Sequence, residues 1–191
     1  MGRISHHPFE TWPRRRRRLA LILVTVAAVL PILLGAVTKP LHEDVTGESI
    51  VDFELAGSVD RANDILDAWE AEGVIDDAKA IQVFDLVYPL IYSFALAGLC
   101  VAAAGAWRRR GRVGWGRVGI AMAWVAFAAA AFDYLENVGL MISLWDEPHS
   151  PWPQISKAAA IVKFAGIYAS LAYALTGIAA WALSRRRRSP P

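Results

Sequence analysis

The most informative stretch of this sequence reads Ala131-Phe132-Asp133-Tyr134-Leu135-Glu136-Asn137-Val138-Gly139-Leu140. It places two carboxylates and an amide inside an apolar run, residues 118–144, which as a helix is long enough to cross a hydrocarbon core about 30 Å thick. A charge inside such a segment costs about 2.5–3.5 kcal/mol on insertion scales, so it is expected to face protein or water and to have a partner. Asp133, Glu136 and Asn137 lie at i, i+3 and i+4 and therefore share one stripe of the helix.

The composition is that of a small integral membrane protein. The chain has 191 residues, 55% of them hydrophobic, and its mean hydropathy of +0.34 is too apolar for an ordinary soluble domain. The net charge of +2 conceals a strong segregation. Acidic residues dominate 38–80, whereas arginines gather at 14–18, 108–117 and 185–188. Cys100 is the only cysteine, so an intrachain disulfide is excluded.

Four apolar runs predict an all-α fold, an integral membrane four-helix transmembrane bundle occupying residues 19–184. The expected spans are 19–37, 81–107, 118–144 and 157–183. The first span also resembles a signal peptide, but it is longer than the 7–15 apolar residues usual in a signal, so we expect it to stay attached. The tails, 1–18 and 185–191, are basic.

Residues 38–80 are predicted to form an extracytoplasmic helical cap. Ser58 has the character of an N-cap, and the apolar residues after it recur at helical spacing until Gly73. Its acidic polar face is unlike that of an interfacial helix, which favours Lys and Arg, so packing on the bundle is preferred over lying on the membrane. Ile50, Phe53 and Leu55 are expected in a short extended piece before this helix.

The arginines predict the orientation of the chain. All three arginine clusters fall on one side of the proposed spans, which places both termini and the 108–117 loop in the cytoplasm and the cap and the 145–156 turn outside. Tryptophans at span ends match an aromatic belt: Trp107, Trp145, Trp152 and Trp181. We therefore expect a multi-pass protein of the plasma (inner) membrane.

Polar groups from three spans are predicted to lie in one slab of the outer leaflet. Counted from each span midpoint at about 1.5 Å per residue, they lie roughly 3 to 13 Å outward of the centre in the order Asp133, Glu136, Asn137, Lys163, Asp85. Lys163 is expected to face these acids and not lipid. Three acids and one lysine leave an imbalance, which requires a neutral acid, a cation or water.

Two interpretations of this slab stay open. Buried polar groups can simply hold membrane helices together, or they can line a cavity, since ionisable groups inside membranes are usually functional. On the second interpretation a set of residues would bind an amphiphile or lipid headgroup: Asp85, Tyr88, Tyr92, Asp133, Glu136, Asn137, Lys163 and Tyr168. Alternatives are an enzyme that uses Asp133 or Glu136 as acid or base on a lipid-like substrate, ion-coupled transport, and a structural or partner subunit.

No catalytic or metal-binding motif accompanies these residues. The sequence lacks H-x-E, HExxH, GxSxG and CxxC patterns, so no catalytic residue, metal or cofactor is assigned. The expected partners are the lipid bilayer and an amphiphilic ligand, with no nucleic acid. The oligomeric state is left open.

Several short pieces carry a resemblance: Phe53-Glu54-Leu55-Ala56-Gly57-Ser58, Phe84-Asp85-Leu86 with Pro89 and Tyr92, and Asp133-Tyr134-Leu135-Glu136-Asn137. In this order, over roughly residues 48–145, they resemble an uncharacterised group of small four-span bacterial membrane proteins. The resemblance implies a bacterial origin and no particular activity. A more distant similarity, in span count and intramembrane acids alone, is to bundles of the sterol-isomerase and sigma-2-receptor type, whose acids bind amine or sterol-like ligands.

Overall fold

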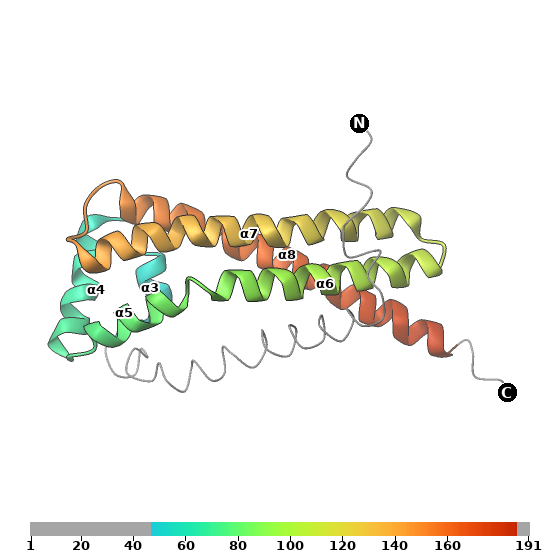
Figure 1. Cartoon of the computed structure of the whole chain (residues 1–191), viewed down its shortest axis with the longest axis horizontal. Coiled ribbons are helices and arrows are strands. Elements are labelled where there is room, and N and C mark those ends of the chain that lie inside the picture. Colours follow the sequence, from blue (N-terminus) through green and yellow to red (C-terminus); the bar gives the residue numbers. More distant parts are fainter. Residues whose placement is uncertain (1–46, 187–191) are drawn as a thin grey trace. The chain divides into compact units, whose positions relative to one another are not determined.

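The chain is helical throughout the part that the structure describes. The computed structural model describes residues 47–186, with side chains as far as residue 177. Its helices follow one another as α3 Ile50–Glu54, α4 Val59–Ala71, α5 Ile75–Phe84, α6 Tyr88–Arg109, α7 Val113–Trp145 and α8 Trp152–Arg186 (Figure 1). The expected first span, 19–37, and the N-terminal basic tail lie outside the described residues, as do residues 187–191.

Three of these helices have the length and composition of membrane spans. They are α6, α7 and the segment Trp152–Gly177 of α8, each with a mean hydropathy between 1.6 and 1.8 in its most apolar window. The expected third and fourth spans are therefore confirmed as long apolar helices. Both helices are longer than the 118–144 and 157–183 predicted for them. Within residues 47–186 the count of candidate spans is three.

The second expected span, 81–107, is not one helix. α5 ends at Phe84 and α6 begins only at Tyr88, with a turn between them. Pro89 explains the break, because it has no N–H to donate to the carbonyl of Asp85 four residues earlier and is tolerated only in a helix's first turn. Residues 81–84 accordingly belong to the short helix α5.

Side chains of α7 hold this break in place. The Asn137 amide donates to the backbone oxygen of Asp85 over 3.2 Å, and the Tyr134 hydroxyl donates to that of Leu86 over 2.9 Å. Carbonyl groups that lose their helical partner in an apolar environment need another donor, because an unpaired backbone group is costly there. The Asp133–Asn137 stretch of α7 therefore fixes the backbone of another segment as well as carrying charge.

The cap helix α4 lies where the sequence predicted it. Ser58 is its N-cap and accepts a hydrogen bond from the Arg61 N–H at 3.2 Å. Beyond its last turn, Gly73 has φ +71°, and the Val74 N–H donates to the Trp69 carbonyl at 2.9 Å. These contacts confirm an N-capped helix that ends just before Gly73.

The prediction of an extended piece around Ile50 is wrong. Residues 50–54 form helix α3, which is nucleated by a capping box. The Asp52 N–H donates to the Ser49 hydroxyl, and the Ser49 N–H donates to the Asp52 carboxylate at 2.8 Å. Hydrogen bonds from Ser49 also hold the pKa of Asp52 below its usual range. Local capping thus decides for a helix where Ile50, Phe53 and Leu55 were expected to be extended.

The chain divides into two compact units, each with its own core. The first, called here the cap unit, consists of residues 47–90 and 130–163 among those described. Trp69 is fully buried there, lies 5.2 Å from the Phe53 ring and donates to the Glu48 carbonyl. The other buried residues of that core are Ala62, Ile65, Val74, Ala78, Leu140 and Leu144.

The second unit, called here the small-residue unit, consists of residues 91–129 and 164–186 among those described. Its core is built mainly from alanines and one cysteine: Ala97, Cys100, Ala103, Ala123, Ala126 and Ala174. Small side chains let helices approach closely and gain dispersion contacts where no hydrophobic effect acts between them. Gly177 of α8 illustrates this, because a Cβ there would lie 2.6 Å from the Cα of Ala103.

Gly177→Ala is predicted to destabilise the protein. Alanine normally stabilises a helix interior relative to glycine by up to about 1 kcal/mol, but here the added methyl collides with α6 and should cost about 1–3 kcal/mol through overpacking. Gly114→Ala is the matched control, since nothing lies within 4 Å of its new Cβ. Thermal unfolding in detergent should show a lower midpoint for Gly177→Ala alone; equal midpoints would contradict the close approach.

Candidate functional site

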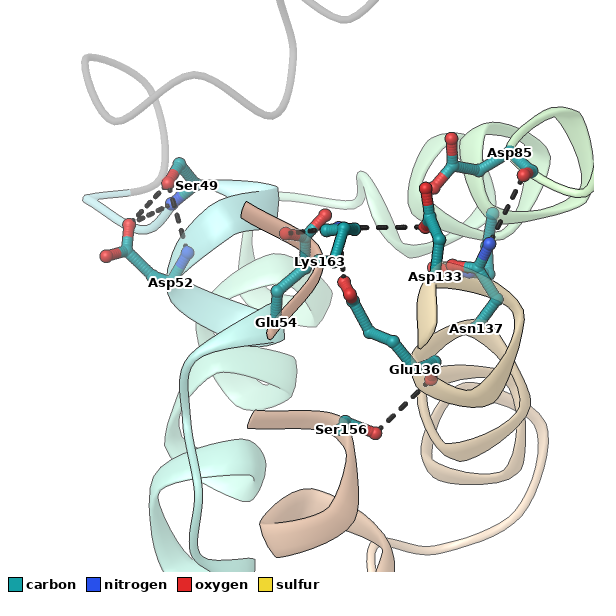
Figure 2. A network of polar contacts seen from close by, with 10 residues as sticks. Ser49, Asp52, Glu54, Asp85, Asp133, Glu136, Asn137, Ser156 and Lys163 are labelled. Atoms are coloured by element: carbon teal, nitrogen blue, oxygen red, sulfur yellow. Dashed lines mark hydrogen bonds and ion pairs between the residues drawn. The ribbon is translucent and has the colours of Figure 1, made fainter. Parts of the chain in front are cut away.

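A buried lysine lies at the centre of the polar groups in the cap unit. Lys163 of α8 is only 4% exposed. Its Nζ lies 2.7 Å from Glu136 Oε1, 3.2 Å from Glu54 Oε2 and 3.7 Å from Asp133 Oδ1 (Figure 2). The prediction that Lys163 faces the acids instead of lipid is therefore confirmed. We call Glu54, Asp85, Asp133, Glu136 and Lys163 the carboxylate cluster.

The close approach of α7 and α8 brings Glu136 and Lys163 together. Gly139 is buried, and a Cβ at this position would collide with the hydroxyl of Ser156 on α8. The same hydroxyl donates to the backbone oxygen of Glu136 at 3.3 Å (Figure 2). A glycine one turn after Glu136 thus lets the helix backbones come near enough for the short Glu136–Lys163 contact.

The amide of Asn137 is already occupied by the protein. It is fully buried, accepts a hydrogen bond from Gln82 Nε2 at 2.7 Å and donates to the Asp85 carbonyl. The expectation that Asn137 binds a ligand thus gains no support, because these contacts give the side chain a structural role between α5 and α7. Gln82 lies three residues before Asp85, and this helical spacing was a signal that the sequence reasoning did not use.

Glu54 is the cluster member that the sequence reasoning missed. It comes from α3 in the cap and is 8% exposed. Its carboxylate contacts the same Lys163 ammonium as the carboxylates of α7 (Figure 2). No spacing in the sequence relates it to the others, since it is 109 residues from Lys163. Its position next to apolar Phe53 and Leu55 was the only indication that it could be buried.

The cluster contains more negative than positive groups. Glu54, Asp133 and Glu136 are buried and contact the Lys163 ammonium, while Asp85 is half-buried. Within the same part of the chain, the second oxygen of Glu136, Oε2, is buried and accepts no hydrogen bond. An uncompensated buried carboxylate is costly, so this site favours the arrival of a proton or a hydrogen-bond donor.

Apolar side chains surround the cluster on the outside of the cap unit. Phe132, Leu135 and Val138 are 38–47% exposed, and they alternate along α7 with the buried Asp133, Glu136 and Asn137. Other exposed apolar side chains come from α5, α6 and α8: Phe84, Leu90 and Ile161. Buried ionisable side chains and exposed apolar side chains therefore occupy the same turns of α7, and an exposed apolar surface of this kind suits lipid.

The predicted tyrosines are divided between the two units and differ in exposure. Tyr88 is half-buried at the start of α6, in the cap unit. Tyr92 is buried in the small-residue unit. Tyr168, in that same unit, is 65% exposed and stacks on Phe164 with ring centroids 6.3 Å apart. Such an exposed position does not support the expectation that Tyr168 lines a buried cavity.

Comparison with known proteins identifies no relative of this chain. No protein-family model, no curated protein and no solved structure matches the chain. The resemblance to small four-span bacterial membrane proteins therefore stays a prediction. Among the described residues, His, Cys, Asp and Glu side chains do not form a group of three suited to a metal ion. A function has to be inferred from the chemistry of the carboxylate cluster.

Lys163→Met is predicted to destabilise the protein strongly. It removes the ammonium that three carboxylates share, and breaking a buried ion pair in this way typically costs about 3–5 kcal/mol. Adding Glu136→Gln should recover part of the loss, because it removes one of the orphaned charges. Lys157→Met, at an exposed position of the same helix, is the control. Chemical unfolding in detergent would give the free energy of unfolding of the parent, the two single variants and the Lys163→Met/Glu136→Gln double variant. A Lys163→Met protein as stable as its parent would contradict the charge argument.

Proposed function

We propose that the carboxylate cluster binds the polar end of an amphiphile or lipid headgroup from the outer leaflet. One observation carries the proposal: Glu136 is fully buried, and one of its oxygens has no hydrogen-bond donor within the described part of the chain. Buried polar atoms are nearly always satisfied, and an exception calls for an explanation such as a functional role or a bound water or ion. Ionisable groups inside membranes are likewise usually functional.

The chemistry of the cluster favours a headgroup that donates hydrogen bonds. Its described members offer carboxylate oxygens in excess, and the ammonium of Lys163 is already shared by Glu54, Asp133 and Glu136. A hydroxyl or an ammonium group would satisfy the second oxygen of Glu136 without adding negative charge. A phosphate would bring further negative charge into a site that already has too much.

Asp85 marks the most open side of the cluster. It is half-buried and follows the last residue of α5, next to the exposed side chains of Phe84 and Val87. An amphiphile could lay its hydrocarbon chain on this apolar surface while its polar end reached Asp85 and then Asp133. Asp85 is also the first residue of the break between α5 and α6, and interrupted helices often form ligand sites in membrane proteins.

A second candidate function is a structural one, and a specific observation favours it. Lys163 joins Glu54 of the cap helix α3 to Glu136 and Asp133 of α7, so one ammonium ties three elements together. Buried polar contacts of this kind stabilise membrane helix packing without any ligand. On this candidate the protein would be a scaffold or partner subunit. The response of Glu136 variants to amphiphiles separates the two functions.

Donor amphiphiles are predicted to stabilise the protein through Glu136. The full chain in lipid nanodiscs would be doped with cetyl alcohol, cetylamine or cetyl phosphate, and its thermal midpoint measured. We expect the alcohol or the amine to raise the midpoint by about 2–4 °C for each kcal/mol of binding, and the phosphate to leave it unchanged. Glu136→Gln should remove most of the shift, because the amide is a weaker acceptor. Asp85→Asn should have a smaller effect.

The outcomes of this titration are distinct. Glu70→Gln, on the exposed face of α4, is the matched control and should behave as the parent. Retention of the full shift by Glu136→Gln would move the site elsewhere and refute the proposal. Absence of any shift, together with a Glu136→Leu protein more stable than the parent, would leave the structural function.

We also propose that the cap is extracytoplasmic and the α6–α7 turn cytoplasmic in a multi-pass plasma membrane protein, on the strength of the arginine distribution. In a Cys100→Ala background, an impermeant maleimide applied to intact cells should label Asn63→Cys and spare Gly114→Cys. Asn63 is exposed on α4, Gly114 has open space around it, and Cys100 is buried. Labelling of Gly114→Cys alone would show that the chain has the opposite orientation in the membrane.

A further inference from the structure

We propose that the turn between α6 and α7 binds anionic phospholipid headgroups at the membrane surface. The surface, called here the basic turn, consists of the exposed side chains Arg109, Arg112, Val113, Trp115 and Arg117. It lies entirely in the small-residue unit. This inference is independent of the carboxylate cluster, so either proposal can fail without the other.

The described part of the small-residue unit carries basic residues and no acidic ones. Residues 91–129 and 164–186 contain no Asp or Glu, whereas the basic turn contributes the exposed side chains of Arg109, Arg112 and Arg117. The guanidinium group stays charged at any physiological pH and pairs with oxyanions in a bidentate manner. The anions that best match such a patch beside apolar helices are the phosphates of the bilayer surface.

Aromatic packing fixes the basic turn at one end of two candidate spans. The ring of Trp115 lies 5.6 Å from that of Trp107 and 6.4 Å from that of Tyr173. The Tyr173 hydroxyl donates to the Trp115 carbonyl at 2.7 Å, and Trp107 Nε1 donates to the Thr176 hydroxyl at 3.0 Å. These contacts join α6, α7 and α8. The arginines beside them are therefore held near a rigid aromatic base.

Exposure of apolar groups within the same turn points to lipid as the partner. Trp115 remains 47% exposed despite its stacking, and Val113 is 53% exposed. Indole rings favour the headgroup level of a bilayer, where an apolar ring and a polar N–H are both satisfied. Arginine and tryptophan side by side thus match the phosphate layer, whereas a nucleic-acid surface would not require the exposed valine.

Lipid titration of the full chain tests the proposal. The delipidated protein in a neutral maltoside detergent would be titrated with short-chain phosphatidylglycerol and with phosphatidylcholine, and bound lipid counted by native mass spectrometry. We expect about a tenfold preference or more for phosphatidylglycerol, which falls as salt is raised. The triple variant Arg109→Gln/Arg112→Gln/Arg117→Gln should lose most of this preference. The triple variant Arg61→Gln/Lys79→Gln/Lys157→Gln removes the same charge from the cap unit and should keep it.

Several results would overturn the proposal. Equal binding of the two lipids by the parent would do so without any variant, so the test does not depend on the triple variant folding. An equal loss in both triple variants would show an effect of net charge alone. Displacement of phosphatidylglycerol by millimolar glycerol phosphate would indicate a soluble phosphate site, and displacement by an RNA oligonucleotide would indicate a nucleic-acid surface.

Discussion

The ammonium of Lys163, shared by carboxylates from two other helices, is the interaction on which the cap unit depends. A lysine that is 4% exposed within an apolar helix is tolerable only if its charge is met at short range. Glu136 at 2.7 Å and Glu54 at 3.2 Å meet it from α7 and α3. Because Glu54 belongs to the cap, the same ammonium connects an amphipathic segment to membrane-type helices.

The broken second span follows from a related constraint. Pro89 cannot complete a continuous helix, and the carbonyls of Asp85 and Leu86 must find other donors. α7 supplies them from Asn137 and Tyr134, the neighbours of Glu136 in sequence. One short stretch of α7 therefore neutralises a buried lysine on one side and stabilises an interrupted backbone on the other. Changes to its polar residues would disturb both.

The two compact units differ in the sign of the charged groups that they collect. The cap unit collects carboxylates around one ammonium, whereas the described part of the small-residue unit contains arginines and no acid at all. A hydrogen-bond donor suits the first and a layer of phosphate suits the second, and a lipid bilayer with its amphiphiles provides both. The two proposed sites thus bind different groups of the same bilayer, and each is formed by its own set of contacts.

Local patterns in the sequence determined the long apolar helices, the Ser58 cap of α4 and the facing of Lys163 toward acids, since hydrophobic runs, N-caps and unpaired charges each have a short-range or energetic signature. Only the tertiary structure decided that Glu54 joins the cluster, because two positions 109 residues apart carry no mutual spacing. It also decided that Asn137 of α7 is occupied in holding the backbone break that Pro89 itself favours. In both cases the partner lies on another helix, and helix packing, not sequence periodicity, sets which side chains meet.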